Sequence, residues 1–237
     1  MSEASHSVSV ASQPKSLLPR LVIRLVITLA VLLILLFGTA GRVDLPFFWA
    51  YLVVLFGIGG AGMFLVHRRH PTLLRERIKP ADKGKDRYTQ PVAQAGSLAC
   101  LMLSAWDVGR AHWSAVPVWL HVVGLLVTAG GLSTWIWAMI SNPFFSSAVR
   151  IQSDRGQAVV SGGPYRWVRH PGYAAALLMF PSIPITLGSW VGILPMLPTM
   201  IMFIRRARLE DRLLRCELKG YQEYATRVRF RVVPGIW

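Results

Sequence analysis

The chain has 237 residues, of which 53% are hydrophobic and 16% charged, and its formal net charge at pH 7 is +15. Such a composition excludes an ordinary soluble domain. The charge does not indicate nucleic-acid binding, because 24 of the 26 Lys and Arg residues fall in four segments, at 15–24, 68–87, 150–169 and 205–231. Two apolar stretches separate each segment from the next, as the positive-inside rule requires. The charge therefore predicts membrane orientation and contact with anionic lipid headgroups.

The N-terminal part predicts a tail followed by a membrane hairpin. Residues 1–16 are rich in Ser and have no periodic apolar face, which is typical of a disordered tail. Residues 21–40 and 45–66 are each close to the ~20 residues that cross a bilayer core, and they turn near Arg42 and Asp44. We interpret residues 21–40 as a retained anchor rather than a signal peptide, because the apolar stretch exceeds the usual h-region and a second span follows at once.

The middle of the chain predicts two further spans and two long connections. Residues 68–90 form a basic loop with two prolines, and residues 91–106 and 117–140 are weaker apolar blocks of spanning length. After them, residues 142–171 run for about thirty positions without helical periodicity. A connection of this length and irregularity is usually functional rather than a mere tether.

The last third predicts a short hairpin and a surface helix. Residues 172–203 are apolar but short for two full crossings, so we expect two tilted short helices or a re-entrant pair that turns near Gly188. Residues 205–228 repeat Leu and Tyr at helical spacing among many charges, which predicts an amphipathic helix against the protein or the membrane surface. Cys100 and Cys216 lie in a predicted span and in this helix, so no disulfide is expected.

Together these elements predict an all-α integral membrane protein. We expect about six membrane-inserted helices, the last two a short hairpin, and a cytosolic C-terminal amphipathic helix. The expected organisation is a disordered tail at 1–16, a transmembrane hairpin with a basic loop at 17–90, and a core at 91–237. Both termini and the loop 68–90 are expected in the cytosol.

Polar residues flank the predicted final hairpin on both sides, within 152–173 and 205–234, so these two clusters must lie close together. They contain the donors Arg169, His170 and Arg206, the acceptors Glu210 and Asp211, and the rings of Tyr165 and Tyr173. Such a site beside lipid suits a polar zwitterionic cofactor that acts on an amphipathic substrate. Neither cysteine has a partner at metal-ligand spacing, and no metal is expected.

Two stretches then give the site a family resemblance. "GGPYRWVRHPGY", followed by "RRARLEDRLLRCELKGYQEYATRVRFRVVP", resembles the isoprenylcysteine carboxyl methyltransferase family, whose wider circle includes phospholipid N-methyltransferases and methanethiol S-methyltransferases. The resemblance covers about residues 100–235 and implies S-adenosylmethionine as cofactor, capped by the C-terminal helix. The chain's similarity to bacterial members of the family implies a bacterial inner membrane as the location. Two positions depart from the family pattern, because the second acid of the pair is Asp211 rather than Glu and the position of Gln157 is often His.

The resemblance also implies roles for single residues. Arg206 and Glu210 would be catalytic, with Arg206 facing the acceptor. The implied cofactor-binding residues are Gln152, Gln157, Val159, Val160, Tyr165, Arg169, His170, Pro171, Tyr173, Glu210 and Asp211. An acceptor carboxylate needs no general base but does need a cation to position it, whereas an amine needs a base such as Glu210 or Asp211.

The function expected from these residues is methyl transfer at the cytosolic membrane face to a lipophilic acceptor, with O-methylation of a carboxylate favoured. N- or S-methylation of a lipid amine or small thiol is an alternative. "RCELKG" is similar to a stretch of sterol-type membrane reductases, so an NADPH-dependent reductase is a second alternative. A non-enzymatic scaffold for anionic lipids is the third, in which Lys83 and Lys85 would matter more than His170 or Glu210.

Overall fold

The computed structural model describes residues 17–78 and 86–237, and this part of the chain contains helices and turns but no strand. The all-α prediction is confirmed. The predicted tail at 1–16 and the middle of the basic loop, with Lys83 and Lys85, lie outside the described residues. The α-helices are α1 (Leu17–Leu33), α2 (Pro46–Arg69), α3 (Pro71–Ile78), α4 (Thr89–Trp106), α5 (Val118–Ser141), α6 (Pro171–Leu187), α7 (Met196–Glu217) and α8 (Tyr221–Arg227).

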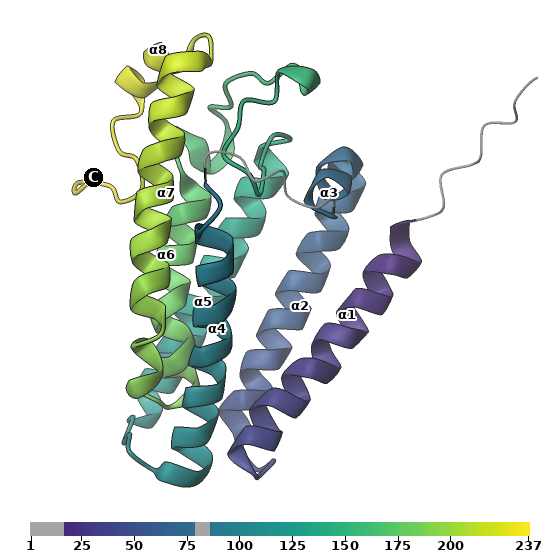
Figure 1. Cartoon of the computed structure of the whole chain (residues 1–237), viewed down its shortest axis with the longest axis vertical. Coiled ribbons are helices and arrows are strands. Elements are labelled where there is room, and N and C mark those ends of the chain that lie inside the picture. The colour runs from purple at the N-terminus through teal and green to yellow at the C-terminus, as the bar shows by residue number, and fades with distance from the viewer. Residues whose placement is uncertain (1–16, 79–85) are drawn as a thin grey trace, which may run out of the picture.

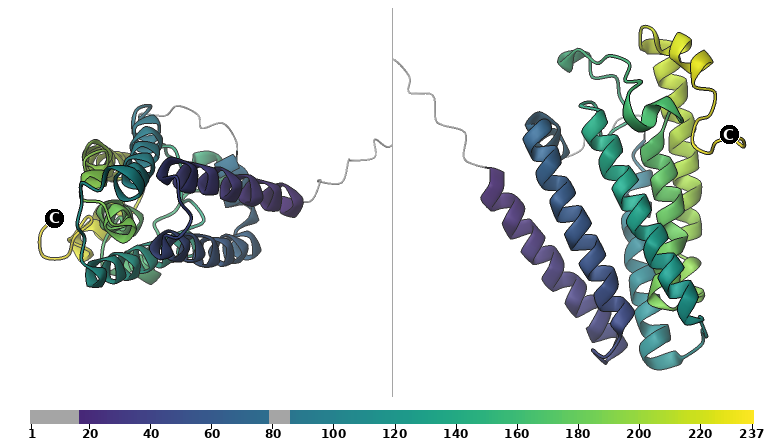
Figure 2. Two further views of the ribbon diagram at one scale, coloured as in Figure 1. Left: turned by 90° about the horizontal axis from the view of Figure 1, so that it is seen from below. Right: turned by 180° about the vertical axis from the view of Figure 1, so that it is seen from behind.

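Helices α4 to α7 run side by side as a bundle, and α2 packs along α5 (Figure 1). Helix α1 continues as a π-helical turn at Ile34–Gly38 and diverges from α2 towards its own start (Figure 2). The bundle end that carries α3, α8 and the C-terminus is called the basic end below. Helix α1 starts on the side of this end (Figure 1), so the first described residues and the C-terminus lie on one side of the molecule.

Two helices are each long and apolar enough to cross a membrane. Helices α2 and α5 both have 24 residues, with mean hydropathies of 2.0 and 1.6 over their most apolar windows. At 1.5 Å per residue, each spans ~36 Å, which exceeds the ~30 Å hydrocarbon core. The apolar helices Val22–Gly38 and Pro171–Leu187 are shorter. By length and composition, two of the described helices can therefore cross a membrane, while the number of six membrane-inserted helices stays a prediction.

A buried carboxylate fastens the bundle at the end opposite the basic end. Asp107 Oδ1 accepts the backbone N–H groups of Trp113 and Ser114, at 2.8 and 3.0 Å, and Oδ2 accepts the hydroxyls of Ser114 and Ser189. The neighbouring turn between α6 and α7 falls at Gly188, as predicted from the sequence. Its φ of +100° lies in the left-handed region that favours glycine.

The C-terminal segment differs from its prediction, because 205–228 is not one surface helix. Helix α7 begins in the apolar part of the chain at Met196 and continues without a break into the charged part as far as Glu217. The chain then turns through Gly220, with φ +80°, before the short helix α8. A positive φ cannot continue a right-handed helix, which explains the break. One helix therefore joins the hairpin to the basic end.

Candidate active site

A cavity of about 470 Å³ lies in the basic end of the bundle, within the ~300–1,000 Å³ typical of small-ligand sites. Its wall changes character along its length. The polar part is formed by Asn142, Ser146, Ser147, Gln157, Tyr165, Arg169, His170, Tyr173, Arg206, Glu210, Tyr221 and Tyr224. The apolar part comes from α2, α5, α6 and α7 and includes Leu55, Leu132, Ala176, Met179, Phe180 and Phe203. Polar and apolar ligand groups can therefore share one space.

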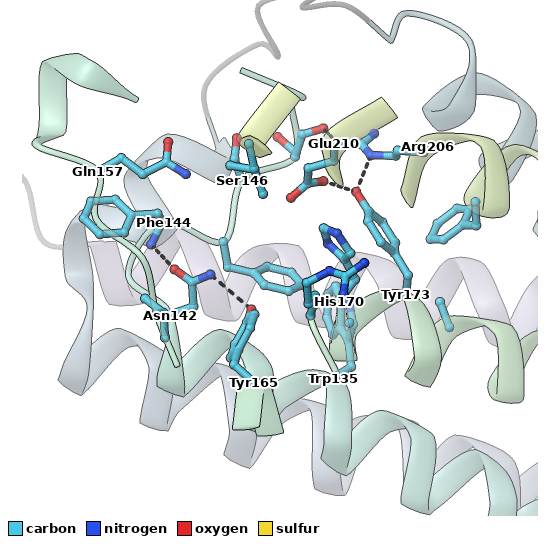
Figure 3. Close-up of a pocket in the computed structure, with 18 of the residues that line it drawn as sticks. Trp135, Asn142, Phe144, Ser146, Gln157, Tyr165, His170, Tyr173, Arg206 and Glu210 are labelled. Carbon is cyan, nitrogen blue, oxygen red and sulfur yellow. Dashed lines mark hydrogen bonds between the residues drawn. The ribbon is translucent and has the colours of Figure 1, made fainter. Parts of the chain in front are cut away.

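The connection between α5 and α6 folds over the cavity because of a few local hydrogen bonds. Asn142 accepts the backbone N–H of Phe144 at 2.8 Å and donates to the Tyr165 hydroxyl at 3.1 Å (Figure 3). Gly163 has φ +58°, and a Cβ there would lie 2.3 Å from Ser141 Oγ. No larger residue fits this approach. Burial raises the pKa of the Tyr165 phenol above its ordinary value, so the group stays protonated.

Three predicted site residues form one hydrogen-bonded relay (Figure 3). The Tyr173 hydroxyl donates to Glu210 Oε2 and accepts from Arg206 Nε at 2.9 Å. Arg206 also donates from Nη2 to the Ser147 carbonyl at 2.5 Å. Arg206 and Glu210 are four residues apart on α7 and so lie on the same helix face. Tyr173 reaches them from the first turn of α6, which confirms that the two polar clusters meet.

Asp211 faces a different way from Glu210, since consecutive helix residues point about 100° apart. Its carboxylate is fully buried and accepts Arg169 Nε at 2.8 Å, Arg231 Nε at 2.8 Å and the Tyr221 hydroxyl at 3.0 Å. Burial alone would raise its pKa, but hydrogen bonds from His170, Arg169 and Arg231 outweigh this and hold the pKa well below the ordinary value. Asp211 is therefore ionised and lies outside the cavity lining.

Asp211 and the side chains that donate to it, called the Asp211 hub below, also hold the C-terminal segment against the cavity. Arg169 Nη1 donates to the carbonyls of Val228 and Arg229, both at 2.7 Å. The backbone N–H groups of Arg169 and His170 donate to the carbonyls of Phe230 and Arg231 at 3.0 and 2.8 Å. The tail thus covers the start of α6, and both Arg169 and His170 line the cavity. Pro171 occupies the first turn of α6, where a missing N–H is harmless, and is outside the lining.

Gln152 is also placed differently from its prediction. Its side chain donates from Nε2 to the Phe144 carbonyl at 2.7 Å and accepts Arg155 Nη1 at 2.5 Å. Its backbone N–H donates to Gln157 Oε1 at 2.7 Å. These bonds shape the connection but leave Gln152 outside the lining. Gln157 lines the cavity together with Val159 and Val160.

Several lining residues were not identified from the sequence. Trp135 and Phe145 contact each other edge to face, with ring centroids 6.0 Å apart, and both line the cavity. The aromatic pair Phe144–Phe145 directly after a span was the available signal for this part of the wall. Leu55 and Gln90 come from helices far away in the chain. No local pattern marks such residues.

These features define a membrane protein with a ligand site at one end of its helical bundle. Residues 119–219 match the family model for phospholipid methyltransferase. The match runs from the start of α5 to the turn after α7 and so includes most of the polar wall. The chain therefore carries a domain of the isoprenylcysteine carboxyl methyltransferase and phospholipid methyltransferase family of membrane methyltransferases. This family consists of membrane-associated enzymes that use S-adenosylmethionine. No curated protein matches the chain.

Proposed function

We propose that this chain binds S-adenosylmethionine in the polar part of the cavity and methylates an acceptor whose apolar portion occupies the apolar part. The single observation that carries the proposal is the continuity of one cavity across walls of opposite character, in the region that matches the methyltransferase family. S-adenosylmethionine supplies an electrophilic methyl group when bound. The protein has to align this group with the acceptor and exclude water.

The polar wall has groups that fit such a cofactor. Glu210 uses Oε2 for Tyr173, while Oε1 has no hydrogen bond to any described residue, which leaves a carboxylate oxygen for an ammonium or a ribose hydroxyl. The rings of Tyr173, Trp135 and Phe145 line the same cavity. Aromatic faces attract a desolvated cation, so they suit a sulfonium. Gln157 and Ser146 add polar groups to the same lining (Figure 3).

We infer a carboxylate as the favoured acceptor group, because Arg206 provides a buried cation in the wall next to the apolar part. Transfer of a methyl group to a carboxylate oxygen releases no proton, so the site needs no base. N-methylation of a lipid amine is the second candidate. It is favoured by the phospholipid methyltransferase match and by Glu210, which would take the proton that the amine loses.

The acceptor is proposed to come from the bilayer. Leu55 on α2 and Gln90 on α4 both line the cavity, so the apolar part extends between these two helices. We propose that the basic end faces the cytosol of a bacterial cell, with both termini on that side, anionic lipids against its Lys and Arg residues, and the water-soluble cofactor arriving from there.

Cofactor binding tests this function directly. In Glu210→Gln, we expect S-adenosylhomocysteine to bind about tenfold more weakly in isothermal titration, because a charge-assisted hydrogen bond is lost. Glu223 is exposed on α8, and Glu223→Gln is the matched control, expected to bind as the wild type does. Equal affinities in the two variants would contradict the placement of the cofactor. Methyl-labelled S-adenosylmethionine incubated with lipid extracts then identifies the acceptor.

A further inference from the structure

Arg206 keeps one nitrogen without an acceptor although its side chain is buried. Nε donates to the Tyr173 hydroxyl and Nη2 donates to the Ser147 carbonyl. Nη1 has no hydrogen-bond partner in the described part of the chain. A buried donor without an acceptor costs free energy, and Arg206 lines the cavity. The positive charge of Arg206 is therefore not fully matched by the hydrogen bonds of its side chain.

The carboxylate nearest to Nη1 belongs to Asp86, whose side chain is fully buried. Asp86 Oδ2 lies 3.6 Å from Arg206 Nη1, too far for a hydrogen bond, and this oxygen has no partner among the described residues either. Asp86 Oδ1, by contrast, accepts a hydrogen bond from Arg205 Nη1 at 3.1 Å. Asp86 therefore attracts Arg206 through charge alone and would stay paired with Arg205 if that attraction ended.

The position of Asp86 connects it to the cavity on two sides. Asp86 is not among the lining residues, so it contacts Arg206 from outside the lining. It lies three residues before Thr89, the first residue of α4, and Gln90, in the first turn of that helix, lines the cavity. A change at Asp86 can thus alter both the charge of the wall at Arg206 and the start of α4.

We propose that Asp86 determines which head groups the acceptor site takes. Asp86 partly neutralises the charge of Arg206, and an anionic head, carboxylate or phosphate, on an apolar chain competes with Asp86 for that charge from inside the cavity. A neutral head brings no charge with which to compete against Asp86. This inference rests on the proposed function and adds a specificity residue to it. The exchange makes and breaks no covalent bond.

The test compares two probes of equal chain length, tetradecanoate and tetradecanol, on the full chain in neutral lipid nanodiscs with S-adenosylhomocysteine present. Removal of the competing charge in Asp86→Asn should tighten tetradecanoate binding about tenfold, because two unit charges about 4 Å apart interact strongly at the effective dielectric constant of a protein, and leave tetradecanol unchanged. Asp86→Glu keeps the charge and should bind as the wild type does. Asp154→Asn removes an exposed acid that is paired with Arg150 of the same connection and serves as the control.

A second variant acts in the opposite direction and changes only a half-exposed side chain. Arg205→Gln removes the other positive charge beside Asp86, so the charge of Asp86 acts on Arg206 alone and tetradecanoate should bind about tenfold more weakly. The inference is overturned if Asp86→Asn weakens tetradecanoate binding or leaves it unchanged, if both probes tighten equally, or if Arg205→Gln does not weaken it. Failure of the wild type to bind S-adenosylhomocysteine refutes the proposed function instead.

Discussion

The substitution Asp211→Asn distinguishes the role of Asp211 from that of its neighbour Glu210. The asparagine keeps one acceptor oxygen but places an NH₂ donor against guanidinium donors. The largest loss of stabilisation is at Arg169, because its side chain is only 3% exposed and water cannot replace the lost carboxylate. Removing one partner of such a buried pair costs ~3–5 kcal/mol. Arg215 and Arg231 are 40% and 28% exposed, so each of their pairs adds only ~0–1 kcal/mol.

We therefore expect Asp211→Asn to lower the free energy of unfolding in detergent by ~3–5 kcal/mol. S-adenosylhomocysteine affinity should fall with it, because the Asp211 hub holds Arg169, His170 and Tyr221 in the cavity wall. Glu210→Gln should lose affinity with little loss of stability. The measurements are denaturant unfolding followed by fluorescence and calorimetric binding, with Asp154→Asn as the exposed control. A stable Asp211→Asn that has lost only cofactor binding would refute this division of roles.

Two further predictions use pH and the native cysteines. Because the pKa of Asp211 is lower in the folded protein than its ordinary 3.8, its contribution to stability is present above about pH 3.8 and is lost as the pH falls through the folded value. The difference in unfolding free energy between wild type and Asp211→Asn should therefore stay constant from pH 8 to 5, and a loss between pH 7 and 6 would contradict the assignment. Cys216 is exposed at the basic end and Cys100 is buried. A membrane-impermeant maleimide should therefore label Cys216 in inverted vesicles but not in intact cells, and leave Cys100 unlabelled. Labelling of Cys216 in intact cells would show that the topology is the opposite of the proposed one.

The sequence was most informative where one physical rule dominates. Apolar blocks of spanning length located α2 and α5, because the cost of exposing polar groups to lipid leaves few alternatives to a helix. The turn at Gly188 was predicted because the apolar stretch was too long for one crossing and too short for two. The meeting of Tyr173, Arg206 and Glu210 followed from the hairpin, since both of its ends return to the same side.

Three of the predicted cofactor-binding residues, Gln152, Pro171 and Asp211, do not line the cavity, and the reason is geometric. Gln152 and Asp211 have the polar groups that a ligand site needs, but their bonding is used within the protein by Arg155, Arg169 and Arg231. Which neighbour a buried polar group chooses depends on tertiary placement, which residue spacing does not encode. The extent of α7 was mistaken for a related reason, because the helix continues through its change from apolar to charged residues, where the sequence pattern indicated the start of a separate helix.

That continuity gives α7 a mechanical role that a separate surface helix could not have. Phe203 lines the apolar part of the cavity, Glu210 lines the polar part, and Arg206 lies between them on the helix. All three are on one face of α7. The helix is held in place by Asp211 on an adjacent face through Arg169 and the C-terminal tail. A displacement of this helix therefore moves the apolar and the polar parts of the cavity wall together, by the same amount. Alignment of the two reactants, which supplies much of the rate in a transfer of this kind, then depends on a single element whose register the Asp211 hub determines.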